Sequence, residues 1–298
     1  MCYGTNPLGA LFLYEDGINA NSVLFYRFAL AVVMLGLLMA VKGKSLLVSG
    51  RELALLAVLG VVFSTSSMSL YFSFCFMDAG IASTLLFVYP VMVAVIMAVL
   101  FKERLSAAAL FAIVLALVGI ALLYNGDGGV RLSTAGVLLV MLSSLSYAIY
   151  IVVVNKSPLR ISSLKLTFYV LFFGMLTILA NSFVSGIHIQ MLTTPRMWLC
   201  AFMLALLPTV FSLVLMVIAV HEIGSTPTAV MGALEPLTAV VIGVTVFGEQ
   251  LTARLSVGIV LILLAVMIIV AGKSFSPARV IHVVSHLGHV ISKTWRWK

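Results

Sequence analysis

The chain has 298 residues, of which 63% are hydrophobic and only 9% are charged. This composition excludes a soluble globular protein, because a soluble fold of that length could not bury so much apolar surface. The formal net charge of +8 does not indicate a nucleic-acid-binding protein, since the basic residues are scattered over short loops.

Ten apolar runs follow one another along the chain. They lie near residues 1–14, 22–41, 52–76, 81–101, 106–124, 134–154, 164–184, 197–220, 225–247 and 253–272. All but the first are long enough to cross a bilayer, and inside lipid only helices or closed barrels satisfy the backbone. Barrel strands are about 10 residues long, so the longer runs exclude them. The sequence therefore predicts an all-α, polytopic membrane bundle of ten transmembrane helices.

Polar side chains in the first two runs are candidates for a binding site. Tyr3 and Asn6 lie in the first run, and Arg27 lies near the outer end of the second. A guanidinium there either reaches toward lipid headgroups or points inward at an anionic substrate. The sequence leaves both interpretations of Arg27 open.

Hydroxyl-bearing residues in the later runs form a second group of candidates for lining a pathway. A membrane serine or threonine commonly lets helices approach or bonds back to its own helix, so packing is the favoured interpretation for most of them. A tyrosine can form the wall of a cavity and donate one hydrogen bond. The group comprises Tyr26, Ser64, Thr65, Ser66, Ser67, Tyr71, Tyr89, Ser143, Ser144, Tyr147, Tyr150 and Thr209.

The foremost candidate is Glu235, which lies in the ninth run between Leu234 and Pro236. Ionisable residues inside a membrane are costly and commonly line a pathway, so Glu235 is expected to carry a proton or to bind a cationic group. A carboxyl group that only holds helices together by a hydrogen bond is the alternative. Pro236 lacks an amide donor, so it can kink the helix and leave carbonyls free beside a cavity.

The stretch from Pro90 to Leu105 returns 146 residues later as Pro236 to Leu251. This repeat predicts two units of five spans, residues 1–124 and 134–272, joined by an external linker at 125–133. Because five is odd, the two units enter the membrane from opposite sides. A binding site is expected between them.

Each repeated segment begins with a deep proline and ends with a glutamate at a membrane surface, about 20 Å away along the helix. Glu103 is expected at the cytoplasmic side and Glu249 outside, where ion pairs with neighbouring basic residues would fix the helix ends. Tyr3 aligns with Tyr147, so residues 134–146 of the sixth span have almost no counterpart ahead of Tyr3, and the first span looks truncated. A start upstream of Met1 is favoured over a genuine half-helix, whose backbone would need partners at membrane depth.

Lysine and arginine concentrate on one side of the predicted membrane. That side holds Lys42, Lys44, Arg51, Lys102, Arg104, Lys156, Arg160, Lys165, Lys273, Arg279, Lys293, Arg296 and Lys298, and the other holds Arg131, Arg196 and Arg254. The basic side is normally cytoplasmic, so both termini are expected there. The tail 273–298 is expected to lie on the cytoplasmic leaflet as a basic amphipathic helix, and a regulatory or partner-binding tail is the alternative.

Nothing in the sequence indicates a metal, a cofactor or an enzyme. Cys2, Cys75 and Cys200 have no pair spacing, and the five histidines are scattered. HExxH, GxSxG and Walker-type motifs are absent from the sequence.

Four short motifs occur at corresponding or characteristic places in the two repeats. They are the Glu-x-Leu that ends each repeated segment, the deep prolines, Tyr26-Arg27-Phe28 in the second run and Glu235-Pro236 in the ninth. With these motifs in these places, the chain resembles the EamA-type transporters of the drug/metabolite transporter superfamily. The resemblance covers roughly residues 3 to 272. It implies carrier-mediated movement of small metabolites, often export of amino acids or related compounds, without ATP hydrolysis. With the short loops, it also indicates a bacterial inner membrane.

The predicted function is a secondary carrier in the lipid bilayer, monomeric or homodimeric, that works by alternating access. Arg27 and Glu235 facing one cavity would suit a zwitterion such as an amino acid, and protons are the candidate coupling ion. The alternatives are an exporter of drugs or other cationic compounds and a non-transporting membrane enzyme or sensor. A channel is disfavoured because no filter-like segment is visible. The sequence determines neither the substrate nor the direction of transport.

Overall fold

The computed structural model describes residues 2–43, 45–102, 107–124, 133–157, 161–212, 215, 234–249 and 252–272. Within these ranges every regular element is a helix, so the predicted all-α fold is confirmed. The elements are η1 (Cys2–Thr5), α1 (Asn6–Glu15), α2 (Ala20–Val41), α3 (Gly50–Ser73), α4 (Ala79–Leu86), α5 (Tyr89–Phe101), α6 (Ala107–Tyr124), α7 (Thr134–Lys156), α8 (Ser163–Ser185), α9 (Pro195–Ala205), the π-helical turn η2 (Leu206–Phe211), α12 (Leu234–Phe247) and α13 (Ala253–Gly272).

Five segments are long and apolar enough to cross a membrane, namely α2, α3, the α4–α5 pair, α7 and α8. Shorter apolar helices occupy Ala107–Leu122, Pro195–Phe211, Glu235–Phe247 and Ala253–Ile268. The described helices overlap the predicted runs, of which the first is the short η1–α1 segment, and the eighth and ninth runs are described only in part.

Large apolar side chains cover the outside of the bundle, and several polar side chains are buried inside it. Leu37 and Leu117 are about two-thirds exposed, at 63% and 60%, whereas Arg27, Ser143 and Ser144 are buried. Lipid solvates apolar side chains and cannot solvate polar ones, so polar groups collect inside a membrane bundle. The chain is an integral membrane protein by fold as well as by composition.

Helices begin where side chains can satisfy the free amides of the first turn. The Asn19 side chain accepts a hydrogen bond from the Ser22 amide, 2.8 Å away, at the start of α2. Ser49 and Glu52 form a capping box at the start of α3. These caps place the helix ends in the polar loops between apolar runs.

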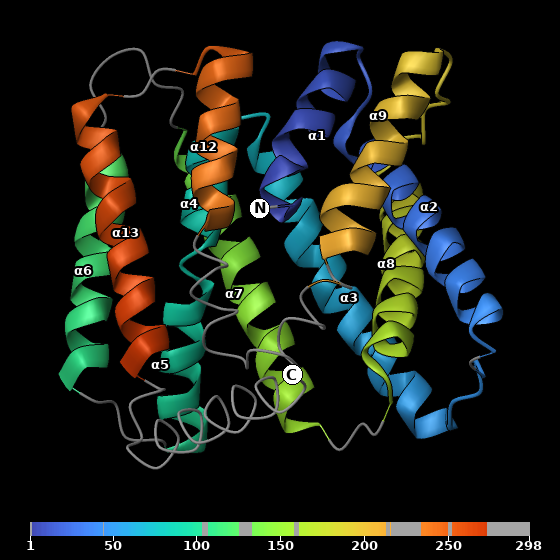
Figure 1. Ribbon diagram of the computed structural model, residues 1–298, viewed down its shortest axis with the longest axis horizontal. Coiled ribbons are helices and arrows are strands. Elements are labelled where there is room, and N and C mark those ends of the chain that lie inside the picture. Colours follow the sequence, from blue (N-terminus) through green and yellow to red (C-terminus); the bar gives the residue numbers. More distant parts are fainter. Residues whose placement is uncertain are drawn as a thin grey trace, which may run out of the picture.

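The bundle is held together by contacts between the two predicted units. Helix α2 packs against α8, α4 against α12, and α6 against α13 (Figure 1). The contact of α1 with α9 has a counterpart in the contact of α7 with α3, as an exchange of the two units would produce. Segments far apart in the sequence therefore meet throughout the bundle.

Small residues allow some of these helices to approach closely. A Cβ atom added to Gly119 of α6 would lie 2.8 Å from the Ile262 side chain of α13. One added to Gly60 of α3 would lie 2.5 Å from the Phe173 Cβ of α8. Glycine at such crossings lets the backbones pack within van der Waals contact, as is common in membranes.

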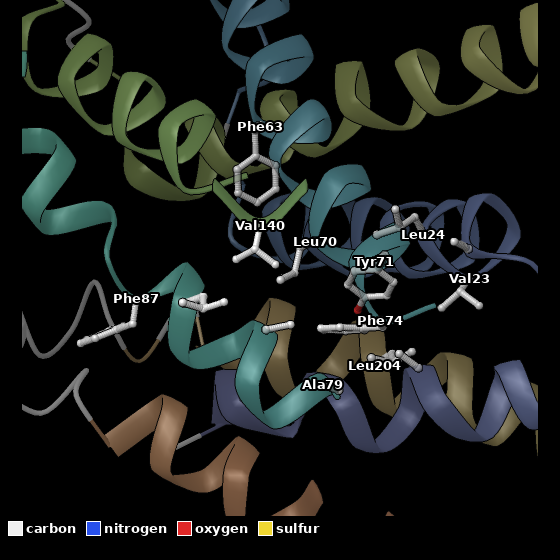
Figure 2. Packing of buried hydrophobic residues seen from close by; sticks show 14 of the residues in the cluster. Val23, Leu24, Phe63, Leu70, Tyr71, Phe74, Ala79, Phe87, Val140 and Leu204 are labelled. Atoms are coloured by element: carbon white, nitrogen blue, oxygen red, sulfur yellow. The ribbon is translucent and has the colours of Figure 1, made fainter. Parts of the chain in front are cut away.

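Helix α3 supplies much of the core. Figure 2 shows the rings of Tyr71 and Phe74 beside one another, with Leu24 of α2 and Leu204 of α9 nearby. The two ring centroids are 5.4 Å apart. Tyr71 is fully buried, so its hydroxyl group needs hydrogen-bond partners inside the protein. That hydroxyl is part of the candidate site described below.

The fourth run is a broken helix, because α4 ends at Leu86 and α5 begins at Tyr89. Pro90 has no amide hydrogen, so the carbonyl four residues earlier loses its helical partner. The Ser144 hydroxyl of α7 donates to that carbonyl, on Leu86, over 2.9 Å. Pro236, the equivalent proline of the second unit, is buried in the first turn of α12.

Some sequence predictions fall outside the described residues. They concern Glu103, residues 125–132 of the linker and the tail 273–298.

Candidate functional site

Arg27 points into the bundle from α2. Its side chain is only 2% exposed, so in this structure it does not reach toward lipid headgroups. Its Nε donates to Thr209 Oγ1 over 2.9 Å, and its Nη1 donates to the Tyr71 hydroxyl over 2.9 Å. The sequence left open whether Arg27 reaches toward lipid headgroups or points inward, and in the structure it points inward.

The partners of Arg27 come from both halves of the sequence. The Tyr71 hydroxyl, on α3, in turn donates to Asn6 Oδ1 of α1 over 3.3 Å. Thr209 belongs to η2, and its hydroxyl donates to the Leu204 carbonyl over 3.1 Å. The widened π-turn carries Thr209 to the guanidinium, and such turns are frequent at functional sites.

Two tyrosine rings flank the guanidinium. The Arg27 Cζ atom lies 5.9 Å from the centroid of the Tyr3 ring and 5.5 Å from that of Tyr71. An aromatic face within about 6 Å attracts a cation. The predicted candidates Tyr3, Asn6, Tyr71 and Thr209 therefore gather around Arg27, although they are far apart in the sequence.

The Arg27 charge is not neutralised by any carboxylate of the described residues. The ion pairs found there join Arg196 to Glu15 and to Asp16 at the end of the bundle. A buried charge with neutral partners only is costly, because neutral hydrogen bonds replace water incompletely. An anionic group that reached Arg27 would offset this cost.

A continuous row of aromatic rings leads away from Arg27. Phe28 and Phe63 have centroids 5.9 Å apart, and Phe63 and Tyr150 are 5.3 Å apart. Tyr150 stacks on Tyr147 at 5.9 Å, and Tyr147 meets Tyr89 edge-on at 4.7 Å. The row joins α2, α3, α7 and α5, and it ends beside the break in the fourth run.

Glu235 lies at the far end of this row, in the first turn of α12. Its side chain is partly buried and interacts electrostatically with Tyr89 and Tyr147. Gly4 packs directly on that turn, since an added Cβ atom would lie 2.4 Å from the Glu235 carbonyl oxygen. Tyr3, the neighbour of Gly4, thus lies between the Arg27 cluster and the Glu235 end of the row.

The serine and threonine run of α3 takes no part in this cluster. The hydroxyls of Ser64 and Thr65 donate to the Val61 carbonyl of their own helix, each over 2.9 Å. Ser66 and Ser143 exchange hydroxyl-to-carbonyl hydrogen bonds that join α3 to α7. These are contacts of packing residues, so the proposed binding role of Ser64 and Thr65 gains no support from the geometry.

Glu249 does not form the ion pair with Arg254 that its position in the sequence suggested. Its carboxylate instead accepts from the amides of Ala79 at 2.8 Å and Gly80 at 3.1 Å, at the start of α4. Burial raises the pKa of Glu249, the Gly80 amide opposes this, and the charge of Asp78 raises it further. The chain turns at Gly248, whose φ of 66° is left-handed, and this turn carries the carboxylate toward α4.

Sequence reasoning missed the aromatic row and the Ser144 contact. Phe28 and Phe63 look like ordinary apolar residues of a span, and only the fold brings them into line with Tyr147 and Tyr150. The sequence signal for the Ser144 contact was Pro90, because the carbonyl that loses its helical partner at a proline needs another hydrogen-bond donor. Among the described residues, no three potential metal-ligating side chains lie together.

Comparisons with known proteins agree with this architecture. A solved crystal structure covers 90% of this chain and 94% of its own length, with a TM-score of 0.58 and 15% identity, and so supports the fold alone. An uncharacterized transporter of Archaeoglobus fulgidus is 29% identical over 191 residues, which cover 64% of this chain and 67% of the relative. One of Clostridium kluyveri is 23% identical over 277 residues, covering 89% of this chain and 88% of the relative.

The model of the EamA-like transporter family matches residues 1–125 and 134–271. These two matches take in all the helices described above and nearly the whole of the chain outside the tail. The chain is a membrane transporter that belongs to the EamA-like transporter family.

Proposed function

We propose that the protein is a secondary carrier that exports small zwitterionic metabolites, such as amino acids or related compounds, by alternating access. The observation that carries this proposal is the buried guanidinium of Arg27, which has only neutral partners among the described residues. A transported anion would supply the missing charge, because Arg binds carboxylates through paired, charge-assisted hydrogen bonds.

In this proposal the substrate lies between Arg27 and Glu235. Its carboxylate binds Arg27, in place of one or both neutral partners, and its ammonium group binds Glu235. The side chain of the substrate lies along the aromatic row, where Tyr89 and Tyr147 cover it. Opposite charges at the two ends would select zwitterions over simple anions.

The two repeated units, 1–124 and 134–272, would rock against one another around this site. Arg27 and Thr209 belong to different units, and so do Tyr89 and Glu235. A substrate bridging them therefore contacts both moving parts. Glu235 would also exchange the coupling proton, since it is an ionisable group inside the membrane.

The remaining parts of the proposal concern placement in the cell. The excess of Lys and Arg on one side predicts cytoplasmic termini, and the tail 273–298 would lie on the cytoplasmic leaflet. A bacterial inner membrane and a monomer or homodimer are the expected setting.

A second candidate function is the export of cationic drugs. The aromatic row and Glu235 would suit an organic cation, because aromatic faces attract positive charge. The two candidates differ in their use of Arg27. Export of a cation would tolerate the loss of the guanidinium, whereas a zwitterion would lose its main contact.

The test is ligand-induced thermal stabilisation of the purified protein with amino acids, nucleosides, sugars and cationic drugs at two pH values. A ligand that binds only the folded state raises its melting temperature. We expect one class of zwitterion to stabilise the wild type, and Arg27→Gln and Glu235→Gln each to abolish the shift. Wild-type shifts in both variants would refute the clamp. Uptake into vesicles that saturates with substrate distinguishes a carrier from a channel.

A further inference from the structure

Glu249 joins two parts of the chain that are far apart in the sequence. It follows α12 of the second unit, yet its carboxylate binds the amides of Ala79 and Gly80, the first two residues of α4 in the first unit. The first amides of a helix are unpaired and carry partial positive charge, so they attract a carboxylate acceptor. Asp78 holds the N-cap position of α4, but its side chain makes no capping hydrogen bond.

The contact lies where α4 and α12 approach each other closely. A Cβ atom on Gly80 would lie 3.1 Å from Val240 Cα, and one on Gly243 would lie 2.1 Å from Glu249 Oε2. Glycine at both positions therefore leaves room for the carboxylate between the two helices. A small pocket beside it is lined by Asp78, Gly80, Ile81, Val240, Glu249 and Ile259. Figure 1 shows α4 beside α12 at this end of the bundle.

Helix α4 is short and is separated from α5 by a break. The break at Phe87–Val88 immediately precedes Tyr89 and Pro90, at the end of the aromatic row. Because α4 and α5 are not one continuous helix, backbone rotation at the break between them can change the angle of α4 and leave α5 in place. The opposite end of α4 is the one held by Glu249.

We propose that Glu249 is a latch that holds α4 against α12 and so closes this end of the bundle in the conformation seen here. Release of the carboxylate from the α4 amides lets α4 move away from α12 and opens a path toward Tyr89. The inference rests on the proposed carrier function, since it assigns the latch to one step of alternating access. The distribution of basic residues predicts that this end faces the outside of the cell.

Thiol labelling measures the state of the latch without any substrate. Thr84 lies on α4 with its side chain fully buried, so a Thr84→Cys reporter reacts with a membrane-impermeant reagent only when α4 moves. The reporter is placed in a chain whose three natural cysteines are replaced by serine. Labelling in right-side-out and in inside-out vesicles shows which side of the membrane the latch faces. A chain that keeps only Cys75, which is exposed just before α4, shows that the reagent reaches this end.

Two variants break the latch from its two sides. Glu249→Ala removes the acceptor, and Ala79→Pro removes one donor at a helix position where proline is well tolerated. Asp78 already has φ −59° and ψ 133°, which suits a residue before proline. We expect both variants to label Thr84→Cys about five-fold faster or more, in line with the loss of a helix cap. The matched control is Glu52→Ala, which removes a capping carboxylate within α3 and should leave the rate unchanged.

A second reporter separates opening of the latch from loss of the fold. Ala31→Cys is buried in α2, which packs against α8 and not on α4. The proposal would be overturned if Glu249→Ala and Ala79→Pro left the labelling rate of Thr84→Cys unchanged. It would also be overturned if they raised the labelling rate of Ala31→Cys as much as that of Thr84→Cys. If Arg27→Gln still binds ligand but Glu249→Ala exposes Thr84→Cys, the substrate assignment fails and the latch stands.

Discussion

The hydroxyl group of Tyr71 offers the sharpest test of the Arg27 cluster. It accepts from Arg27 Nη1 over 2.9 Å and donates to Asn6 Oδ1 over 3.3 Å, so Tyr71→Phe breaks both bonds and keeps the buried ring. A hydrogen bond to a charged group contributes about 1.5–3 kcal/mol and a neutral one about 0.5–1.5 kcal/mol. We expect the free energy of unfolding to fall by about 2–4.5 kcal/mol, measured by titration with a denaturing detergent.

The neighbouring Tyr14 provides a matched control for the same chemical change. Its hydroxyl donates a single hydrogen bond to the Tyr71 carbonyl over 3.0 Å. Tyr14→Phe should therefore cost only about 0.5–1.5 kcal/mol, and it should leave ligand affinity unchanged. Tyr71→Phe should weaken binding of the stabilising ligand about ten-fold, which corresponds to roughly 1.4 kcal/mol of lost positioning of the guanidinium. Equal losses of stability in the two variants, with binding intact in both, would refute the role assigned to Tyr71.

Three further outcomes are expected. The Asn21 side chain is fully buried, and neither polar atom of its amide has a hydrogen-bond partner among the described residues. Asn21→Leu should therefore raise the unfolding free energy by about 1–3 kcal/mol. A loss of stability or of ligand binding in this variant would show that the amide makes a contact that matters. Ser144→Ala leaves the Leu86 carbonyl without its donor and should cost about 1 kcal/mol in the same detergent titration; an unchanged unfolding free energy would exclude that role. Glu249 has a raised pKa when folded, so the folded state holds its proton more tightly, and stability should fall as the pH rises above the ordinary value of 4.5. Glu249→Gln cannot ionise, and a thermal melt of this variant that keeps the wild-type pH slope would refute the assignment.

The fold could be predicted because membrane helices are encoded locally. Each span needs its own run of apolar residues, and each run can be read without knowledge of the others. Arg27 and Glu235 could be singled out for the same reason, since a charge within such a run is conspicuous. Their surroundings could not be predicted, because the partners of Arg27 are 44 and 182 residues away in the sequence.

Glu249 shows how local reasoning fails at a helix end. Arg254 is close in sequence, and an ion pair between neighbours was the expected role. The amides at the start of α4 lie about 170 residues away in the sequence, and they donate to the carboxylate instead. The left-handed turn at Gly248 decides between the two partners, because it carries the side chain toward α4. A glycine after a helix signals the turn, but it does not indicate what the turned chain will meet.

The neutral partners of Arg27 are themselves informative about transport. An internal glutamate bound to Arg27 would stabilise the empty carrier, and a substrate carboxylate would then have to break an ion pair before it could bind. The hydroxyls of Tyr71 and Thr209 satisfy the guanidinium without neutralising it. A carboxylate can therefore replace them with a gain in charge pairing and leave again when they return. Tyr71 and Thr209 belong to different predicted units, so in the proposed carrier this exchange would also weaken a contact between the units when the substrate binds, as alternating access requires.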